Sequence, residues 1–149
     1  MNDFENNLNH LLVNTFNYIT KYEELSLKSI YAVPVTVSEA HIIENISKNS
    51  DGVNVSSLAS SLNISMPTVT VALKKLEAKG FITKNPCAVD GRRSIISLTE
   101  TGERVNKAHS LFHERMVKNI SRKFSDLEKD VLLSAINTLS EFFKEKVEA

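Results

Sequence analysis

The chain has 149 residues, of which 42% are hydrophobic and 24% charged, and its 18 basic and 18 acidic residues give a formal net charge of zero. This length allows one domain with a core of its own, and the composition is that of ordinary soluble proteins. No apolar run approaches the ~20 residues of a membrane span, and no basic segment precedes an apolar signal core, so we expect a cytoplasmic protein without membrane contacts.

Two helices are predicted at the start of the chain. Apolar residues recur there at helical spacing, at Leu8, Leu11, Leu12, Phe16 and Ile19. This amphipathic helix should end at Pro34, because residues before a proline disfavour the helical conformation. Thr36 and Glu39 then form a capping box for a second helix. The inward residues of that helix should be Ala40, Ile43 and Ile46.

The stretch from Asn54 to Gly80 predicts two short helices joined by a tight turn. Asn54 can cap the first helix, and Asn63 tolerates the left-handed conformation that a turn needs. Ser65 begins the second helix, with Pro67 in its first turn and Gly80 at its end. The buried face of this second helix should hold the apolar residues at helical spacing: Val69, Ala72, Leu73 and Leu76.

The opposite face of the second helix should point outward and consist of Met66, Pro67, Thr68, Thr70, Val71, Lys74 and Lys75. Methyl and hydroxyl groups at the start of a helix suit base edges in a DNA major groove, and lysines suit phosphates. An ordinary solvated helix of a helical bundle is the alternative.

A β-hairpin should follow, with strands over residues 81–85 and 94–98. The segment between the strands contains an Asp90-Gly91 turn and two arginines, Arg92 and Arg93. A helix-turn-helix followed by a hairpin predicts a mainly α fold with a small β-hairpin wing, the winged helix-turn-helix. One of the arginines can then reach an adjacent minor groove.

Two long amphipathic helices end the chain. Thr99 caps the first, and Ser125 with Glu128 forms a capping box for the second. Together with the opening helix they carry more apolar surface than one small core buries, so we expect a homodimer. A dimer would place two recognition helices roughly 34 Å apart, which matches palindromic double-stranded DNA.

Charge is segregated along the chain. Residues 62–93 carry six basic and two acidic residues, whereas the chain from Asp126 onward carries six acidic residues and three lysines. The excess of basic residues thus lies in the proposed DNA-binding part. The overall net charge of zero therefore does not argue against DNA binding.

These motifs, in this order, resemble the MarR family of bacterial transcriptional regulators. The resemblance rests on LASSLNIS, on PTVTVALKKLEAKGFI, on an Asp-x-Arg wing signature at Asp90 and Arg92, and on Leu-Thr-x-x-Gly at Leu98, Thr99 and Gly102. It implies a single domain over residues 1–149, with dimerisation helices at 1–35 and 100–149 and a DNA-binding part at 36–99. The residues that we expect to contact DNA are Ser65, Pro67, Thr68, Thr70, Val71, Lys74, Lys75, Asp90, Arg92 and Arg93.

The histidines suggest a metal site. His109 and His113 are four residues apart, a spacing at which two imidazoles can bind the same metal ion. Histidines that are hydrogen-bonded within a core can have the same spacing, and this is the alternative. Glu24, His41, His109 and His113 resemble the zinc-ligand set of the zinc-uptake repressors within the MarR family. The second metal cluster of those repressors is not matched, because Ile30, Ala40 and Ala108 stand at its positions.

A second branch of the family gives a different effector. The segments YEELSL and FHERMVKNI and the GRR wing resemble the FabT-like repressors of fatty-acid synthesis genes. That resemblance implies acyl carrier protein with a long acyl chain as co-repressor. The acyl channel would be lined by residues such as Leu25, Phe112 and Met116, for which core packing is the alternative. The glutamate and histidines would then form a polar, hydrogen-bonded cluster beside an effector pocket.

Other functional classes have weaker support. The single cysteine, Cys87, excludes an internal disulfide and a zinc finger, and we expect a neutral, exposed thiol at the wing tip. An enzyme is not expected, because the sequence contains no phosphate loop, serine elbow or paired-carboxylate motif. A winged helix used only for protein contacts would not need the basic wing.

Overall fold

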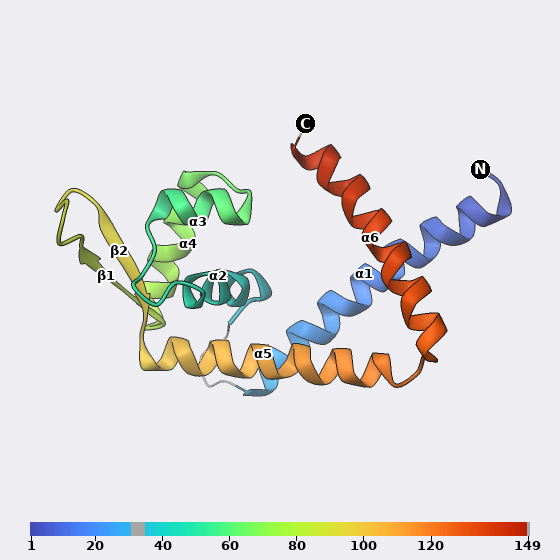
Figure 1. Cartoon of the computed structure of the whole chain (residues 1–149). Helices are drawn as coiled ribbons and strands as arrows, with labels where there is room; N and C mark the ends of the chain where they lie inside the picture. Colours follow the sequence, from blue (N-terminus) through green and yellow to red (C-terminus); the bar gives the residue numbers. More distant parts are fainter. Residues whose placement is uncertain (31–34, 149) are drawn as a thin grey trace. The chain divides into compact units, whose positions relative to one another are not determined.

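A computed structural model of the protein describes residues 1–30 and 35–148, which form six helices and one β-hairpin (Figure 1). The helices are α1 (Asp3–Ile30), α2 (Val37–Ser47), α3 (Val55–Leu62), α4 (Met66–Ala78), α5 (Glu100–Ser121) and α6 (Asp126–Glu148). The hairpin pairs β1 (Ile82–Pro86) with β2 (Ser94–Leu98) in antiparallel register. The predicted end of the first helix at Pro34 lies outside the described residues.

The chain divides into two compact units, Met1–Phe112 and His113–Ala149. The first unit holds α1 to α4, the hairpin and the first part of α5, and the second holds the rest of α5 with α6. None of the helices in the described ranges is both long and apolar enough to cross a membrane. The predicted winged helix-turn-helix is confirmed within the first unit.

The helix ends of the helix-turn-helix follow from local chemistry. Asn54 accepts a hydrogen bond from the Ser57 amide at 2.8 Å, and Asn63 adopts a left-handed φ of 52° between α3 and α4. Gly80 has a φ of +78°, and the amides of Gly80 and Phe81 donate to the Glu77 and Leu76 carbonyls. This Schellman arrangement ends α4 as predicted.

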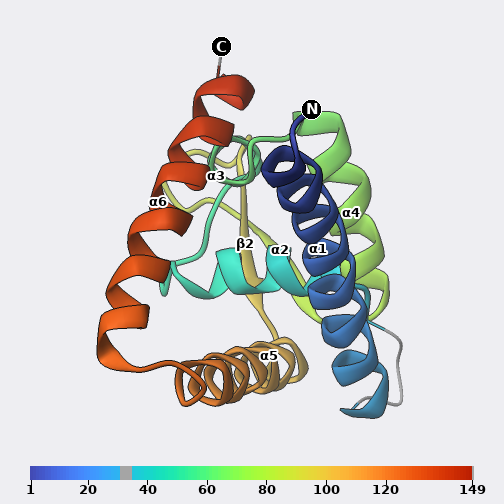
Figure 2. The same cartoon turned by 90° about the vertical axis from the view of Figure 1, so that its right-hand side faces the viewer.

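The core of the first unit lies between α2, α3, α4 and the hairpin. The fully buried residues include most of those predicted on α2 and α4, namely Ala40, Ile43, Ile46, Val69, Leu73 and Leu76. Ala72, also predicted on the buried face of α4, is only partly buried and packs against this core. Helix α2 contacts α1, α3 and β2 and runs across this unit (Figure 2). Predicted strand 81–85 begins one residue later, because Phe81 completes the turn after α4 and is buried in the core.

The Leu-Thr-x-x-Gly motif joins the hairpin to α5. The Thr99 hydroxyl donates to the Gly80 carbonyl at 2.6 Å and accepts from the Gly102 amide at 3.1 Å, which caps α5. A Cβ added at Gly102 would lie 2.1 Å from the Phe81 carbonyl oxygen. Glycine is therefore required here by close packing of α5 on the end of α4.

Candidate nucleic-acid interface and histidine cluster

Helix α4 presents the outward face that its sequence predicts. Its residues Met66, Pro67, Thr68, Val71, Lys74 and Lys75 are exposed, and Thr70 is half-buried. Ser65 caps the helix by accepting from the Thr68 amide at 3.3 Å. The Thr70 hydroxyl donates to the Met66 carbonyl at 2.9 Å, so its proton is used within the helix. The outward face thus offers chiefly the methyl groups of Thr68 and Val71, with lysines in the following turn.

The wing tip is organised by Asp90. Its carboxylate accepts from the Arg92 amide at 3.1 Å and lies 3.6 Å from Nε of Arg93, while the Cys87 amide donates to the Arg93 carbonyl at 2.8 Å. An acidic side chain would repel DNA phosphates. Asp90, which we predict as a DNA contact, also shapes the turn that carries the two arginines.

Cys87 lies at the end of β1 and is partly exposed. Hydrogen bonds from the backbone amides of Asp90 and Val89 lower the pKa of its thiol below the ordinary value.

An ion pair fixes the end of α4 to α2. Nζ of Lys79 lies 2.8 Å from both carboxylate oxygens of Glu39, whose side chain is only 8% exposed. Glu39 also accepts from the Thr36 amide at 3.0 Å and so completes the predicted capping box. One carboxylate thus orders the start of α2 and the end of α4 together.

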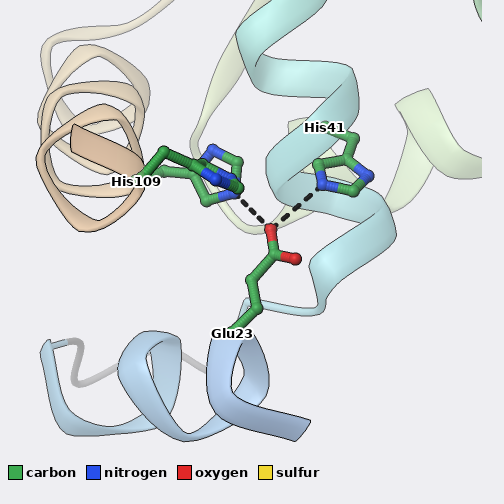
Figure 3. Close-up of side chains that lie close together, drawn as sticks. Glu23, His41 and His109 are labelled. Carbon is green, nitrogen blue, oxygen red and sulfur yellow. Dashed lines mark hydrogen bonds and ion pairs between the residues drawn. The ribbon is translucent and has the colours of Figure 1, made fainter. Parts of the chain in front are cut away.

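A second polar cluster joins three helices of the first unit. Oε1 of Glu23 on α1 lies 3.0 Å from Nε2 of His41 on α2 and 2.5 Å from Nε2 of His109 on α5, as Figure 3 shows. Glu23 and His109 are buried, with 4% and 1% exposure, whereas the side chain of His41 is 48% exposed. His41 is therefore the member of this trio that is exposed to solvent.

The carboxylate in this cluster is Glu23, and the prediction of Glu24 was wrong. The side chain of Glu24 is 41% exposed and pairs with Lys21 at 3.4 Å. Adjacent helical residues point about 100° apart, so only one of the two can face inward. The signal for Glu23 was its spacing of four residues from Leu27, which is buried.

Electrostatics favour an ionised Glu23. Burial raises the pKa of this carboxyl, but the hydrogen bond from His109 and the charges of His41 and His109 outweigh burial, and the pKa is lowered overall. Nδ1 of His109 lies 3.7 Å from Oε2 of Glu44, a second carboxylate beside the same imidazole. His113 follows His109 by one turn of the continuous helix α5, which places both on the same side of that helix.

The residues named for an acyl channel have different environments. Leu25 is 54% exposed, and Phe112 is buried against Tyr22, with ring centroids 5.0 Å apart. Met116 lies in the second unit and is half-buried. Two grooves on the first unit lie elsewhere. One lies between the starts of α3 and α4 and the two arginines of the wing, and the other lies between α2 and α4.

Sequence comparisons relate the chain to bacterial regulators. Residues 35–94 match the model of the MarR family. The transcriptional regulator ZitR of Lactococcus lactis is 34% identical over 90 residues, which cover 58% of this chain and 62% of ZitR. The HTH-type regulator YdgJ of Bacillus subtilis is 31% identical over 96 residues, which cover 62% of this chain and 58% of YdgJ. The chain thus matches less than two thirds of the length of either relative.

Solved structures extend the likeness to nearly the whole chain. The crystal structure of Streptococcus pneumoniae FabT in complex with DNA superposes with a TM-score of 0.89 at 28% identity, covering 95% of this chain and 98% of FabT. The family and the relatives that match are transcriptional regulators rather than enzymes.

Proposed function

Because this chain is a winged helix-turn-helix protein of the MarR family, we propose that it is a dimeric repressor that binds palindromic double-stranded DNA. The observation that carries the proposal is the exposed face of α4 beside a wing tipped with two arginines, on a chain that superposes over 95% of its length on a DNA-bound relative. Methyl groups on α4 would meet base edges in the major groove, and the wing would enter an adjacent minor groove.

The division of roles follows from the contacts at each residue. Thr68 and Val71 would read bases, and Lys74 and Lys75 would contact phosphates, because they lie further along the exposed face. Ser65 and Pro67 order the start of α4, next to the bases. Arg92 and Arg93 would carry positive charge into the minor groove, where the negative potential is strongest.

Replacing Arg92 with alanine tests the role of the wing. A groove-bound arginine displaces counterions from DNA, so Arg92→Ala should weaken operator binding and flatten its dependence on salt. The measurement is the dissociation constant for a selected DNA site at several salt concentrations, with Lys48→Ala, an exposed lysine on α2's end, as the control. Unchanged binding by Arg92→Ala at every salt concentration would contradict the assignment.

Dimerisation is supported by apolar side chains exposed on the flanking helices. Phe4, Leu11 and Phe16 of α1 are 73%, 61% and 70% exposed, and none of the residues of α6 is buried. Apolar faces of this kind are normally covered by a partner. In a dimer with two-fold symmetry, the same apolar faces of two copies of the chain would cover each other.

For the effector we propose an acyl carrier protein with a long acyl chain, which would act as co-repressor. Two observations support this proposal. The segments YEELSL of α1 and FHERMVKNI of α5 resemble FabT-like repressors, and the chain superposes on FabT. Acylated carrier protein should then tighten operator binding, and the unacylated carrier protein should not. Equal effects of the two forms on operator binding would exclude the acyl chain as the signal.

A second candidate effector is zinc, and the Glu23 cluster favours it specifically. Two imidazoles and a carboxylate already converge there, and His113, one turn after His109, is the fourth ligand that we propose. Carboxylate and imidazole donors suit zinc. Bound zinc would hold α1, α2 and α5 together and so fix α1 and α5 against the DNA-binding part, to which α2 belongs.

Metal content separates the two effectors. Protein purified without an affinity tag should contain about one zinc per chain if the cluster is a metal site. His109→Ala should lose the metal, as should Glu23→Gln, whereas the matched variant Glu24→Gln should keep it. Absence of metal after incubation with zinc would leave the cluster as a hydrogen-bonded network and favour the acyl effector.

A further inference from the structure

A groove with a volume of about 500 Å³ separates α4 from α2. Thr36, Ser38 and Ile42 at the start of α2 lie on one wall, and residues of α4 from Pro67 to Lys75 lie on the other. Helix α4 packs instead on α3 and β1. The side of α4 that faces α2 is therefore not filled by core side chains, and there is room for α4 to tilt toward or away from α2. We call this space the interhelical groove.

One ion pair joins the two walls beyond the end of the interhelical groove. Lys79 is the C-cap residue of α4, one turn after Lys75, and its Nζ lies 2.8 Å from both carboxylate oxygens of Glu39 on α2. The two side chains are 27% and 8% exposed, so the pair is largely shielded from solvent. It connects α2 to the end of α4 that lies opposite the base-reading residues.

The carboxylate of Glu39 is held in place by its own helix. Its Oε2 accepts from the Thr36 amide at 3.0 Å, and the Glu39 amide donates to the Thr36 hydroxyl at 3.2 Å. Apolar packing is non-directional, whereas a hydrogen-bonded ion pair has a preferred geometry. The core residues of α4 thus hold the helix on the domain, and the Lys79–Glu39 pair adds a directional contact at one end.

A tilt of α4 about this end would be amplified at its start. The helix has 13 residues, which corresponds to a length of about 20 Å. A tilt of about 10° would therefore displace the first turn, which carries Thr68, by about 3 Å. This displacement is close to the rise of about 3.4 Å per base pair of DNA.

We propose that Glu39 and Lys79 are positioning residues that set the angle between α4 and α2, and thereby the half-site spacing that the protein accepts in its operator. The inference rests on the proposed function, because it concerns a dimer on palindromic DNA. The role requires no contact between either side chain and DNA. Replacing a buried ion pair with apolar residues often leaves stability unchanged, so a geometric role accounts for this pair better than a stabilising one.

Operators with altered spacing test the inference. The duplexes carry the selected palindrome with its centre shortened or lengthened by one base pair, and the dissociation constant of each is measured at low salt, where binding is strongest. The wild type should bind the selected spacing at least about tenfold more tightly than either altered spacing. We call this factor the spacing ratio.

Two variants break the ion pair from opposite sides. Lys79→Met removes the cation and keeps an unbranched side chain, and Glu39→Gln removes the anion while a glutamine can still complete the capping box. Each should lower the spacing ratio at least about threefold, because α4 is then held less precisely. Lys79→Arg, which keeps a cation that can bind both carboxylate oxygens, should retain the spacing ratio within about twofold.

Lys48→Met is the matched control. Lys48 is the C-cap residue of α2, as Lys79 is of α4, but it pairs with Glu44 of its own helix at 3.3 Å and so joins no two helices. Its replacement should leave the spacing ratio unchanged. A variant that is merely less stable contains less folded protein, which weakens binding to every duplex by the same factor. The spacing ratio therefore distinguishes a positioning role from a stabilising one.

The outcomes separate this inference from the proposed function. A wild-type spacing ratio in Lys79→Met or in Glu39→Gln would overturn the positioning role and leave DNA binding intact. An equal decrease in Lys48→Met would overturn it as well, and so would a wild type that binds every spacing equally. Failure of the wild type to select any DNA sequence would overturn the proposed function and the inference with it.

Discussion

Glu23 is a buried carboxylate whose hydrogen-bond partners are two imidazoles. It is 4% exposed and accepts from His41 and His109, which come from different helices. A buried polar group without such partners costs stability, whereas one that is paired contributes. The same three side chains that could hold an ion therefore also connect α1 to the DNA-binding part in its absence.

Replacing Glu23 with glutamine should destabilise the protein even without metal. The amide loses the charge-assisted hydrogen bonds to two imidazoles, and we expect a decrease in the free energy of unfolding of about 1–3 kcal/mol. The measurement is urea unfolding with a chelator present. Glu24→Gln, at the neighbouring exposed residue, should change the free energy by less than about 0.5 kcal/mol. Equal effects of the two variants would show that the cluster does not stabilise the fold.

Residue-level features were predictable where they depend on near neighbours. The caps at Thr36, Asn54 and Ser65 and the left-handed Asn63 all follow from a few adjacent residues, and the structure has each of them. The choice between Glu23 and Glu24 depends on which face of α1 meets α2. That face is set by packing between helices rather than by the local sequence.

The junction between the hairpin and α5 shows how elements are held in place. Gly102 lets the first turn of α5 lie directly against the Phe81 carbonyl, and Thr99 bonds to both sides of the contact. The end of α4 is held from the other side by Lys79 and Glu39. The orientation of the recognition helix thus depends on contacts at its C-terminal end.

An alanine at residue 102 should be destabilising, although glycine to alanine within a helix usually gains about 1 kcal/mol. The added Cβ would collide with the Phe81 carbonyl oxygen at 2.1 Å, so α5 must shift. We expect a net loss of about 1–3 kcal/mol in thermal or urea unfolding. Gly91→Ala is the matched control, because an added Cβ there meets nothing within 4 Å. A Gly102→Ala variant as stable as wild type would refute the close contact.

Element boundaries were predicted best where a helix is capped. Both helices of the helix-turn-helix and both strands of the wing appear where the periodicity of the sequence puts them. The first strand begins one residue later than expected because Phe81 serves the turn after α4, and its side chain is needed in the core. A β-rich run alone cannot distinguish such a residue from the first residue of a strand.

At the scale of the whole molecule, apolar surface is left uncovered on the helices that flank the DNA-binding part. In α6, Leu127, Val131 and Phe142 are 76%, 64% and 53% exposed. The family resemblance predicted the architecture correctly because it spans nearly the whole chain. The effector was not predictable, since zinc and acyl carrier protein are both compatible with the glutamate and histidines of the sequence.

Phe142→Glu should disrupt the proposed dimer. It would place a charge in an apolar contact, so we expect the dimer to dissociate at least about tenfold more readily. The measurement is the molecular mass in solution across a range of protein concentrations, with Lys144→Glu as a control at a charged residue of the same helix. A wild type that is monomeric at every concentration would contradict the dimer itself.

The claim that α4 reads DNA sequence is tested most directly by selecting binding sites from a random library with wild type, Val71→Ala and Lys74→Ala. Wild type should select a palindrome. Val71→Ala removes exposed methyl groups and should change the preferred base at one position in each half-site, with a cost of about 1–3 kcal/mol at the original site. Lys74→Ala should weaken binding without changing the sequence. An unchanged motif for Val71→Ala, or no motif for the wild type, would contradict the assignment of α4 as the recognition helix.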